Sequence, residues 1–251
     1  MILLFDIGNT RIKWAVADER GLGEQYAAAH ADWDAGAFAR IVLDRSPRPA
    51  RVLISNVGGQ RIGELLRAGI HERWQIQPEF VASTAAACGV RNAYPVPGNL
   101  GVDRWLGVIA AYQRSRQLTC IVGVGTAMTI DGVDASGQHL GGLIVPGPDL
   151  MVSSLLRNTS DIARRAEQGS RSDALFADNT QGAIYQGAAH ALAALVDRSV
   201  DAMSREHGVQ PALLLTGGAA SAIERLIRAP FESVPDLVLQ GLCLWGRLEP
   251  A

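Results

Sequence analysis

Short apolar runs, each followed by a turn rich in glycine and threonine, recur along this chain of 251 residues. The first run, Ile2 to Phe5, suits a buried strand, and Asp6 follows it directly. A turn at Gly8 to Thr10 then leads into a second apolar run, Ile12 to Val16, which predicts a β-hairpin. The small turn residues let backbone N–H groups approach a ligand closely, although an ordinary hairpin with a solvated carboxylate explains this stretch equally well.

The same layout returns after residue 116. Leu118 to Val124 is apolar, Gly125 to Ala127 is a small-residue turn, and Met128 to Gly132 predicts the returning strand. A polar turn and a third strand, His139 to Val145, follow, as in the first forty residues. The repeated layout predicts two related halves, 1–116 and 117–251.

Three further segments bear on the candidate chemistry. Gly101 to Arg104 leads into a predicted helix that runs to about Arg114. Asn179 caps a long predicted helix that ends near His207. Ala212 to Leu215 predicts a buried strand that ends in Thr-Gly-Gly, and Ala219 to Arg228 predicts a helix after it. Strand, Gly-Gly and helix is a common nucleotide-contacting arrangement, and it is equally a plain joint between two elements.

Composition excludes several classes of function. The net charge of −2 and the pI of about 6.2 give no electrostatic footprint for nucleic acid. No basic amphipathic segment or long apolar run predicts a membrane partner, and the N-terminal run lacks the charged start of a secretion signal. The three cysteines are scattered in apolar surroundings and predict reduced thiols, so we expect a cytoplasmic protein.

Well-known motifs of other enzyme classes are missing from the sequence. It contains neither the Gly-x-x-x-x-Gly-Lys-Ser/Thr of a P-loop nor a Gly-x-Gly-x-x-Gly after the first strand. It also lacks the Gly-x-Ser-x-Gly of many hydrolases and any His/Cys cluster with metal-ligand spacing.

Two hairpins that hold phosphates between two halves describe the superfamily of acetate and sugar kinases, Hsp70 and actin. Within it, the chain closely resembles type III pantothenate kinase over nearly its whole length. The resemblance rests on several motifs in the expected order: Asp6-Ile7-Gly8-Asn9-Thr10, Gly101-Val102-Asp103-Arg104, the stretch Gly125 to Asp131, the stretch Gly141 to Gly147, Asn179-Thr180, and Thr216-Gly217-Gly218. It implies an α/β protein with a duplicated ribonuclease H-like (actin-like ATPase) fold, in which helices flank mixed sheets.

The resemblance also implies ATP-dependent phosphorylation of pantothenate, the first step of coenzyme A biosynthesis. Asp103 would be the general base, whereas its position at a helix start by itself favours a stabilising first-turn acid. Arg104 would hold the pantothenate carboxylate. The substrate-binding set would be Tyr94, Gly101, Val102, Asp103, Arg104 and Thr180. The ATP-binding set would be Asp6, Ile7, Gly8, Asn9, Thr10, Arg11, Ile12, Lys13 and Thr126. Asp6 would hold Mg²⁺ through water.

Two further expectations come from the resemblance. Thr180 would reach pantothenate from the other subunit of a homodimer. Family members commonly carry Asp-x-Gly-Thr in the second phosphate motif, where the Asp binds a monovalent cation, K⁺ or NH₄⁺; here that position is Gly123. Either the cation binds through other groups or this chain does without it. A kinase for another small hydroxyl compound and a non-catalytic regulator on the same fold remain alternatives.

Overall fold

The computed structural model describes residues 1–166, 170 and 174–247, and it divides into two compact units. Unit 1 contains residues 1–116, 135–139 and the segment from Asp236; unit 2 contains 117–134 and 140–235. The predicted division after Arg116 therefore coincides with a unit boundary. The closing helix does not follow the predicted division, because it packs within unit 1 although it lies in the second half of the sequence.

Unit 1 is built on a sheet of six strands in the order β3-β2-β1-β5-β6, with β4 also paired to β2. Its strands are β1 (Ile2–Ile7), β2 (Arg11–Asp18), β3 (Gly21–Leu22), β4 (Tyr26–Ala29), β5 (Arg51–Asn56) and β6 (Glu79–Phe80), with a separate pair β7 (Ala86–Ala87) and β8 (Val90–Arg91). Its helices are α1 (Ala35–Ile41), α2 (Gln60–Trp74), α3 (Val102–Ser115) and α7 (Leu237–Trp245), with 3₁₀ turns at Leu43–Arg45 and Pro97–Asn99.

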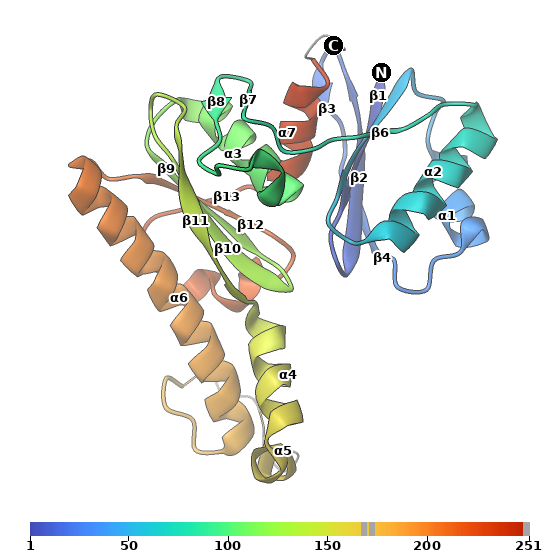
Figure 1. Ribbon diagram of the computed structural model, residues 1–251. Coiled ribbons are helices and arrows are strands. Elements are labelled where there is room, and N and C mark those ends of the chain that lie inside the picture. Colours follow the sequence, from blue (N-terminus) through green and yellow to red (C-terminus); the bar gives the residue numbers. More distant parts are fainter. Residues whose placement is uncertain (167–169, 171–173, 248–251) are drawn as a thin grey trace. The chain divides into compact units, whose positions relative to one another are not determined.

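Both faces of this sheet are buried, which explains the continuous apolar run of β1. Leu3 and Phe5 belong to a core shared with α1 and α2, whereas Leu4 lies in the core formed with α3 and α7. Figure 1 shows these two pairs of helices on opposite sides of the sheet. Both helices α3 and α7 bring leucines to that second core, among them Leu106 and Leu242.

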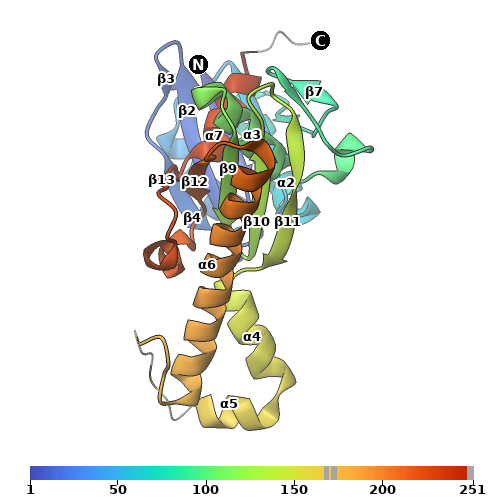
Figure 2. The same cartoon turned by 90° about the vertical axis from the view of Figure 1, so that its left-hand side faces the viewer.

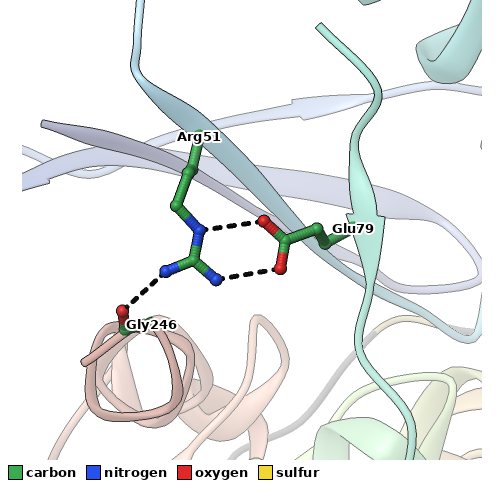
Figure 3. Close-up of polar contacts among 3 residues, drawn as sticks. All are labelled: Arg51, Glu79 and Gly246. Atoms are coloured by element: carbon green, nitrogen blue, oxygen red, sulfur yellow. Dashed lines mark hydrogen bonds and ion pairs between the residues drawn. The ribbon is translucent and has the colours of Figure 1, made fainter. Parts of the chain in front are cut away.

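The end of α7 is tied to the sheet by one arginine. Arg51 Nε and Nη2 donate to the two carboxylate oxygens of Glu79, each at 2.9 Å, and Nη1 donates to the carbonyl of Gly246 at 3.0 Å (Figure 3). This planar fork links β5, β6 and the last turn of α7, and it lowers the pKa of the Glu79 carboxyl.

Unit 2 repeats the sheet layout, in the order β11-β10-β9-β12-β13. Its elements are β9 (Thr119–Val124), β10 (Ala127–Val133), β11 (His139–Pro146), α4 (Pro148–Asn158), α5 (Ser160–Ala166), α6 (Thr180–His207), β12 (Ala212–Thr216) and β13 (Glu232–Ser233), with 3₁₀ turns at Ala220–Ala222 and Glu224–Leu226. In both units an antiparallel hairpin pairs with a parallel strand that leads to a short parallel edge strand. The strand pairing is thus the same in the two units.

The helix α6 is 28 residues long, and it begins and ends where the sequence predicts. The side chain of Asn179 accepts a hydrogen bond from the Gly182 N–H at 2.9 Å, and Gly208 closes the helix in the left-handed conformation. The helices α4 and α5 pack beside α6 (Figure 2). The helix predicted for Ala219–Arg228 is wrong, because this segment forms two short 3₁₀ turns. No helix in the described part of the chain combines the length and the apolar character that a membrane crossing requires.

Candidate active site

The first hairpin turn lies in unit 1 between β1 and β2. The Gly8 N–H donates to the carbonyl of Arg11 at 2.9 Å and closes the turn, while Asn9 and Thr10 stay exposed. Gly58 packs against this turn so closely that a Cβ there would lie 2.5 Å from the Gly8 oxygen. One side of the turn therefore packs against the segment that follows β5. Its other side is exposed and offers backbone N–H donors.

Asp6 lies at the end of β1, behind that turn, and is only 9% exposed. Burial is the main cause that raises its pKa from 3.8 to about 6, and the negative charge of Asp103 adds to the rise. Lys13, its cross-strand neighbour, and a 3.4 Å hydrogen bond from Ser55 Oγ oppose it. The two carboxylates of the predicted site therefore interact electrostatically, and a buried carboxyl with a raised pKa is typical of a functional site.

The start of α3 holds the second carboxylate of unit 1. Asp103 is half-buried, and its Oδ1 accepts a hydrogen bond from the Arg104 N–H at 2.8 Å. Gly101 precedes it, and a Cβ at that position would lie 2.7 Å from the same oxygen, so the side-chain conformation of Asp103 depends on this glycine. The motif thus sets the direction of one carboxylate as well as starting a helix.

Arg104 and Tyr94, which the family resemblance assigns to one substrate pocket, lie together. Arg104 is 8% exposed, its Nη1 donates to the Tyr94 hydroxyl at 3.1 Å, and its guanidinium carbon lies 5.8 Å from the centre of the tyrosine ring. Tyr94 also stacks with His139, at a distance of 6.2 Å between the ring centroids. A largely buried arginine held by an aromatic ring is well suited to bind a carboxylate.

Unit 2 contains the second hairpin turn, with Gly125 and Thr126 exposed between β9 and β10. The Gly147 N–H donates to the Thr126 carbonyl at 2.8 Å, and a Cβ on Gly147 would collide with the Gly125 carbonyl. Gly217, in the left-handed region with φ of 100°, packs in the same way on the backbone of Val124. Three glycine motifs, distant in sequence, therefore meet around one turn.

The two other predicted positions of unit 2 are Gly123, on β9, and Thr180, at the start of α6. Gly123 lies opposite Thr129 in the β9–β10 ladder, and a Cβ on Gly123 would lie 3.0 Å from Thr129 Oγ1. An aspartate at position 123 would thus need Thr129 to move. Thr180 is half-buried as the first residue of α6, next to the cap Asn179.

The structure therefore brings together Asp6, Lys13 and Asp103, and it pairs Arg104 with Tyr94, all within unit 1. Thr126 and Thr180 belong to unit 2. The sequence analysis missed Ser55 and His30, which contact Asp6 and Gly8 respectively. The position of Ser55, a polar residue directly after the apolar run 52–54, weakly indicates a role at the end of a strand. The position of His30 in the sequence does not indicate a contact with Gly8.

Comparison with known proteins agrees with the predicted family. The model of the family described as type III pantothenate kinase matches residues 2–202. Proteins named type III pantothenate kinase from Nitrosococcus oceani and Aromatoleum aromaticum are 40% and 37% identical. The first comparison covers 96% of this chain and 92% of the relative; the second covers all of both.

Two solved structures show the same fold at low identity. A Campylobacter jejuni protein, titled conserved putative Baf family transcriptional activator, is 21% identical with a TM-score of 0.56, over 96% of this chain and 94% of that one. The activator of 2-hydroxyisocaproyl-CoA dehydratase from Clostridium difficile, with bound ADPNP, is 12% identical with a TM-score of 0.54, over 97% and 93%. The fold is that of actin-like ATPases and sugar kinases, with helices flanking mixed sheets. Together with the family match, these findings show that the chain belongs to the type III pantothenate kinases, which phosphorylate pantothenate in coenzyme A biosynthesis.

Proposed function

We propose that this chain transfers the γ-phosphoryl group of ATP to the hydroxyl of pantothenate with Asp103 as the general base. The observation that carries the assignment is the half-buried Asp103 carboxylate, held by the start of α3 close enough to Asp6 to raise the pKa of that carboxyl. As the pantothenate oxygen forms its bond to the γ-phosphorus, the bond between that phosphorus and the bridging oxygen breaks, and this oxygen leaves with ADP. The hydroxyl proton of pantothenate passes to Asp103.

Arg104 and Tyr94 supply the substrate contacts in this proposal. The guanidinium donates to the Tyr94 hydroxyl, and its planar fork of N–H groups has the geometry that suits the pantothenate carboxylate. Gly101 and Val102 approach the substrate with their backbone. Placing the carboxylate end of pantothenate on Arg104 fixes its hydroxyl relative to Asp103, which lies one residue earlier on the same helix.

ATP is assigned to the two hairpin turns. In unit 1 the set is Asp6, Ile7, Gly8, Asn9, Thr10, Arg11, Ile12 and Lys13, and in unit 2 it is Thr126. Phosphate oxygens accept hydrogen bonds from groups of the kinds present here: exposed backbone N–H groups, threonine hydroxyls and the ammonium of Lys13. The close glycine packing at Gly147 and Gly217 supports the second turn as a rigid site.

Asp6 fits the role of a carboxylate that holds Mg²⁺ through water. Mg²⁺ keeps several waters and takes one or two protein carboxylates together with substrate phosphates. The described residues contain no cluster of three or more His, Cys, Asp or Glu that could hold a metal, so a single carboxylate is the fitting donor set. When bound, the ion neutralises charge on the phosphates, and Asp6, which is costly to ionise alone, gains a counter-charge.

A homodimer completes the proposed site, with Thr180 reaching the partner's pantothenate. Exposed apolar side chains on unit 2 support a second copy as the partner: Leu143 and Ile144 on β11 and Leu150 and Leu155 on α4 are 40% to 61% exposed. The proposed place of action is the cytoplasm, where the three free thiols stay reduced.

The variant Thr180→Ala tests that assignment. We expect the KM for pantothenate to rise about fivefold to tenfold, because one hydrogen bond to the substrate is lost, while the KM for ATP stays unchanged. Ser199→Ala, on a remote turn of the same helix, is the control. Equal rises of both KM values in steady-state kinetics would remove Thr180 from the substrate pocket.

The monovalent cation is a separate proposal. Because Gly123 supplies no carboxylate and Thr129 Oγ1 lies 3.0 Å from the place that a Cβ at position 123 would take, we expect turnover to change less than about threefold between Na⁺, K⁺ and NH₄⁺. The measurement is kcat with each cation alone at equal ionic strength. Loss of activity in Na⁺ would show that other groups hold a required cation.

The reaction itself is tested by identifying the product. Mass spectrometry after incubation with ATP, Mg²⁺ and pantothenate should show pantothenate that has gained one phosphoryl group. Phosphorylation of a different hydroxyl compound in a substrate panel, with none of pantothenate, would favour the alternative kinase. Nucleotide binding without any transfer would favour the regulator.

A further inference from the structure

We infer that His30 is a positioning residue for the first phosphate turn, because its ring holds the Gly8 carbonyl and so sets the direction of the Asn9 N–H. The inference rests on the proposed function, since it assigns the turn to ATP. It adds a residue that lies outside every motif of the sequence and on a different strand connection from the turn itself.

The His30 side chain has one clear partner. It is 3% exposed and follows β4 directly, and its Nε2 lies 2.8 Å from the Gly8 oxygen. A carbonyl oxygen can only accept, so Nε2 carries the proton and donates. The other ring nitrogen, Nδ1, is buried and has no hydrogen-bond partner among the described residues. Burying a ring nitrogen without a hydrogen-bond partner destabilises the folded protein, and the hydrogen bond to Gly8 offsets part of that cost.

The backbone around His30 is itself held in place. Its N–H lies 3.4 Å from the Thr10 carbonyl, on the other side of the same turn. Arg61, in the first turn of α2, donates from Nη2 to the carbonyls of His30 and Ala31 and from Nη1 to that of Trp33, each at 3.1 Å. The ring therefore belongs to a segment that Arg61 of α2 holds in place. His30 contacts the turn at two points, the carbonyl of Gly8 and the carbonyl of Thr10.

The consequence for phosphate follows from peptide geometry. The peptide between Gly8 and Asn9 is planar, and in a trans peptide the C=O and N–H point in opposite directions. With the Gly8 carbonyl held on His30, the Asn9 N–H points away from the buried ring. Gly58 closes the space beside that carbonyl, since even a Cβ there would lie 2.5 Å from the oxygen. The peptide cannot easily rotate, and a donor that is already oriented binds phosphate without a cost of reorientation.

The experiment compares substitutions that differ in reach. In His30→Gln the amide nitrogen stands about where Nε2 stood, whereas in His30→Asn it is one carbon short, and His30→Leu removes the donor at similar volume. We expect the Kd for ADP with Mg²⁺, from calorimetry, to rise about tenfold in His30→Asn and His30→Leu and less than threefold in His30→Gln. In steady-state kinetics we expect the KM for ATP to rise in the same variants as the Kd for ADP, and the KM for pantothenate to stay unchanged.

Phe38→Leu, in the same core and away from the turn, is the control for lost stability. Wild-type nucleotide affinity in folded His30→Asn, or equal losses in His30→Gln, His30→Asn and Phe38→Leu, would overturn the inference. The calorimetric comparison does not require turnover. A wild-type protein that binds ADP but does not phosphorylate pantothenate would thus contradict the proposed function and still decide the role of His30.

Discussion

The Asp103→Asn variant should lose about 10²- to 10⁴-fold in kcat while its fold and its affinity for ATP stay close to those of the wild type. The substitution keeps the side-chain shape and the oxygen that accepts from the Arg104 N–H, so the start of α3 is preserved. What it removes is the ability to take the hydroxyl proton of pantothenate. Steady-state kinetics with thermal denaturation as a check on folding measure the effect.

Asp161→Asn is the matched control, because Asp161 is also an acid in the first turn of a helix, α5, and is exposed, with ion pairs to Arg164 and Arg165. If Asp103 only stabilises its helix, the two variants should behave alike, with small losses of stability and little change in kcat. Near wild-type turnover in Asp103→Asn would end its assignment as the base.

The second large effect concerns Asp6, for which activity and stability should move in opposite directions. In Asp6→Asn we expect turnover to fall by more than about a hundredfold, because the carboxylate proposed to hold Mg²⁺ through water is lost. With Mg²⁺ removed by EDTA, we expect the same variant to be more stable than the wild type at pH 7. The reason is that the folded protein raises the pKa of Asp6 to about 6 from 3.8.

That raised pKa fixes the pH range of the stability change. Below about pH 3 the carboxyl is largely protonated in both the folded and the unfolded chain, so its ionisation does not affect stability. As the pH rises from 4 through 6, the unfolded chain ionises more readily, so the wild type loses stability relative to Asp6→Asn. Above pH 6 the difference levels off at about 3 kcal/mol, from a shift of about two pKa units. Denaturant unfolding of both proteins from pH 4 to 8 measures it, and a constant difference would contradict the buried, costly carboxylate.

The local features of this fold could be predicted from the sequence, whereas the features that depend on distant chain segments could not. The hairpin turns and the cap at Asn179 depend on neighbouring residues, and each was predicted at its observed place. The segment after Gly218 has a helical composition, yet it forms 3₁₀ turns, and Gly217 before it packs on Val124 in the left-handed region. Local propensity is a weak prior against such tertiary contacts.

The site shows the same limit. Asp6, Asp103 and Arg104 were found through motifs, but the pKa of Asp6 depends on burial that no motif reveals. Ser55 reaches Asp6 only because β5 pairs with β1 in parallel, and His30 reaches Gly8 only because β4 pairs with β2. For the same reason the packing of α7 in unit 1 could not be inferred from its position at the end of the chain.

The measurement that tests the central claim most directly is ADP release by the wild-type protein with ATP, Mg²⁺ and pantothenate, compared with the same mixture without pantothenate. The account predicts release that depends on pantothenate, saturates with it and is nearly abolished in Asp103→Asn. A folded protein that releases ADP at the same low rate with and without pantothenate, under each monovalent cation, would contradict it.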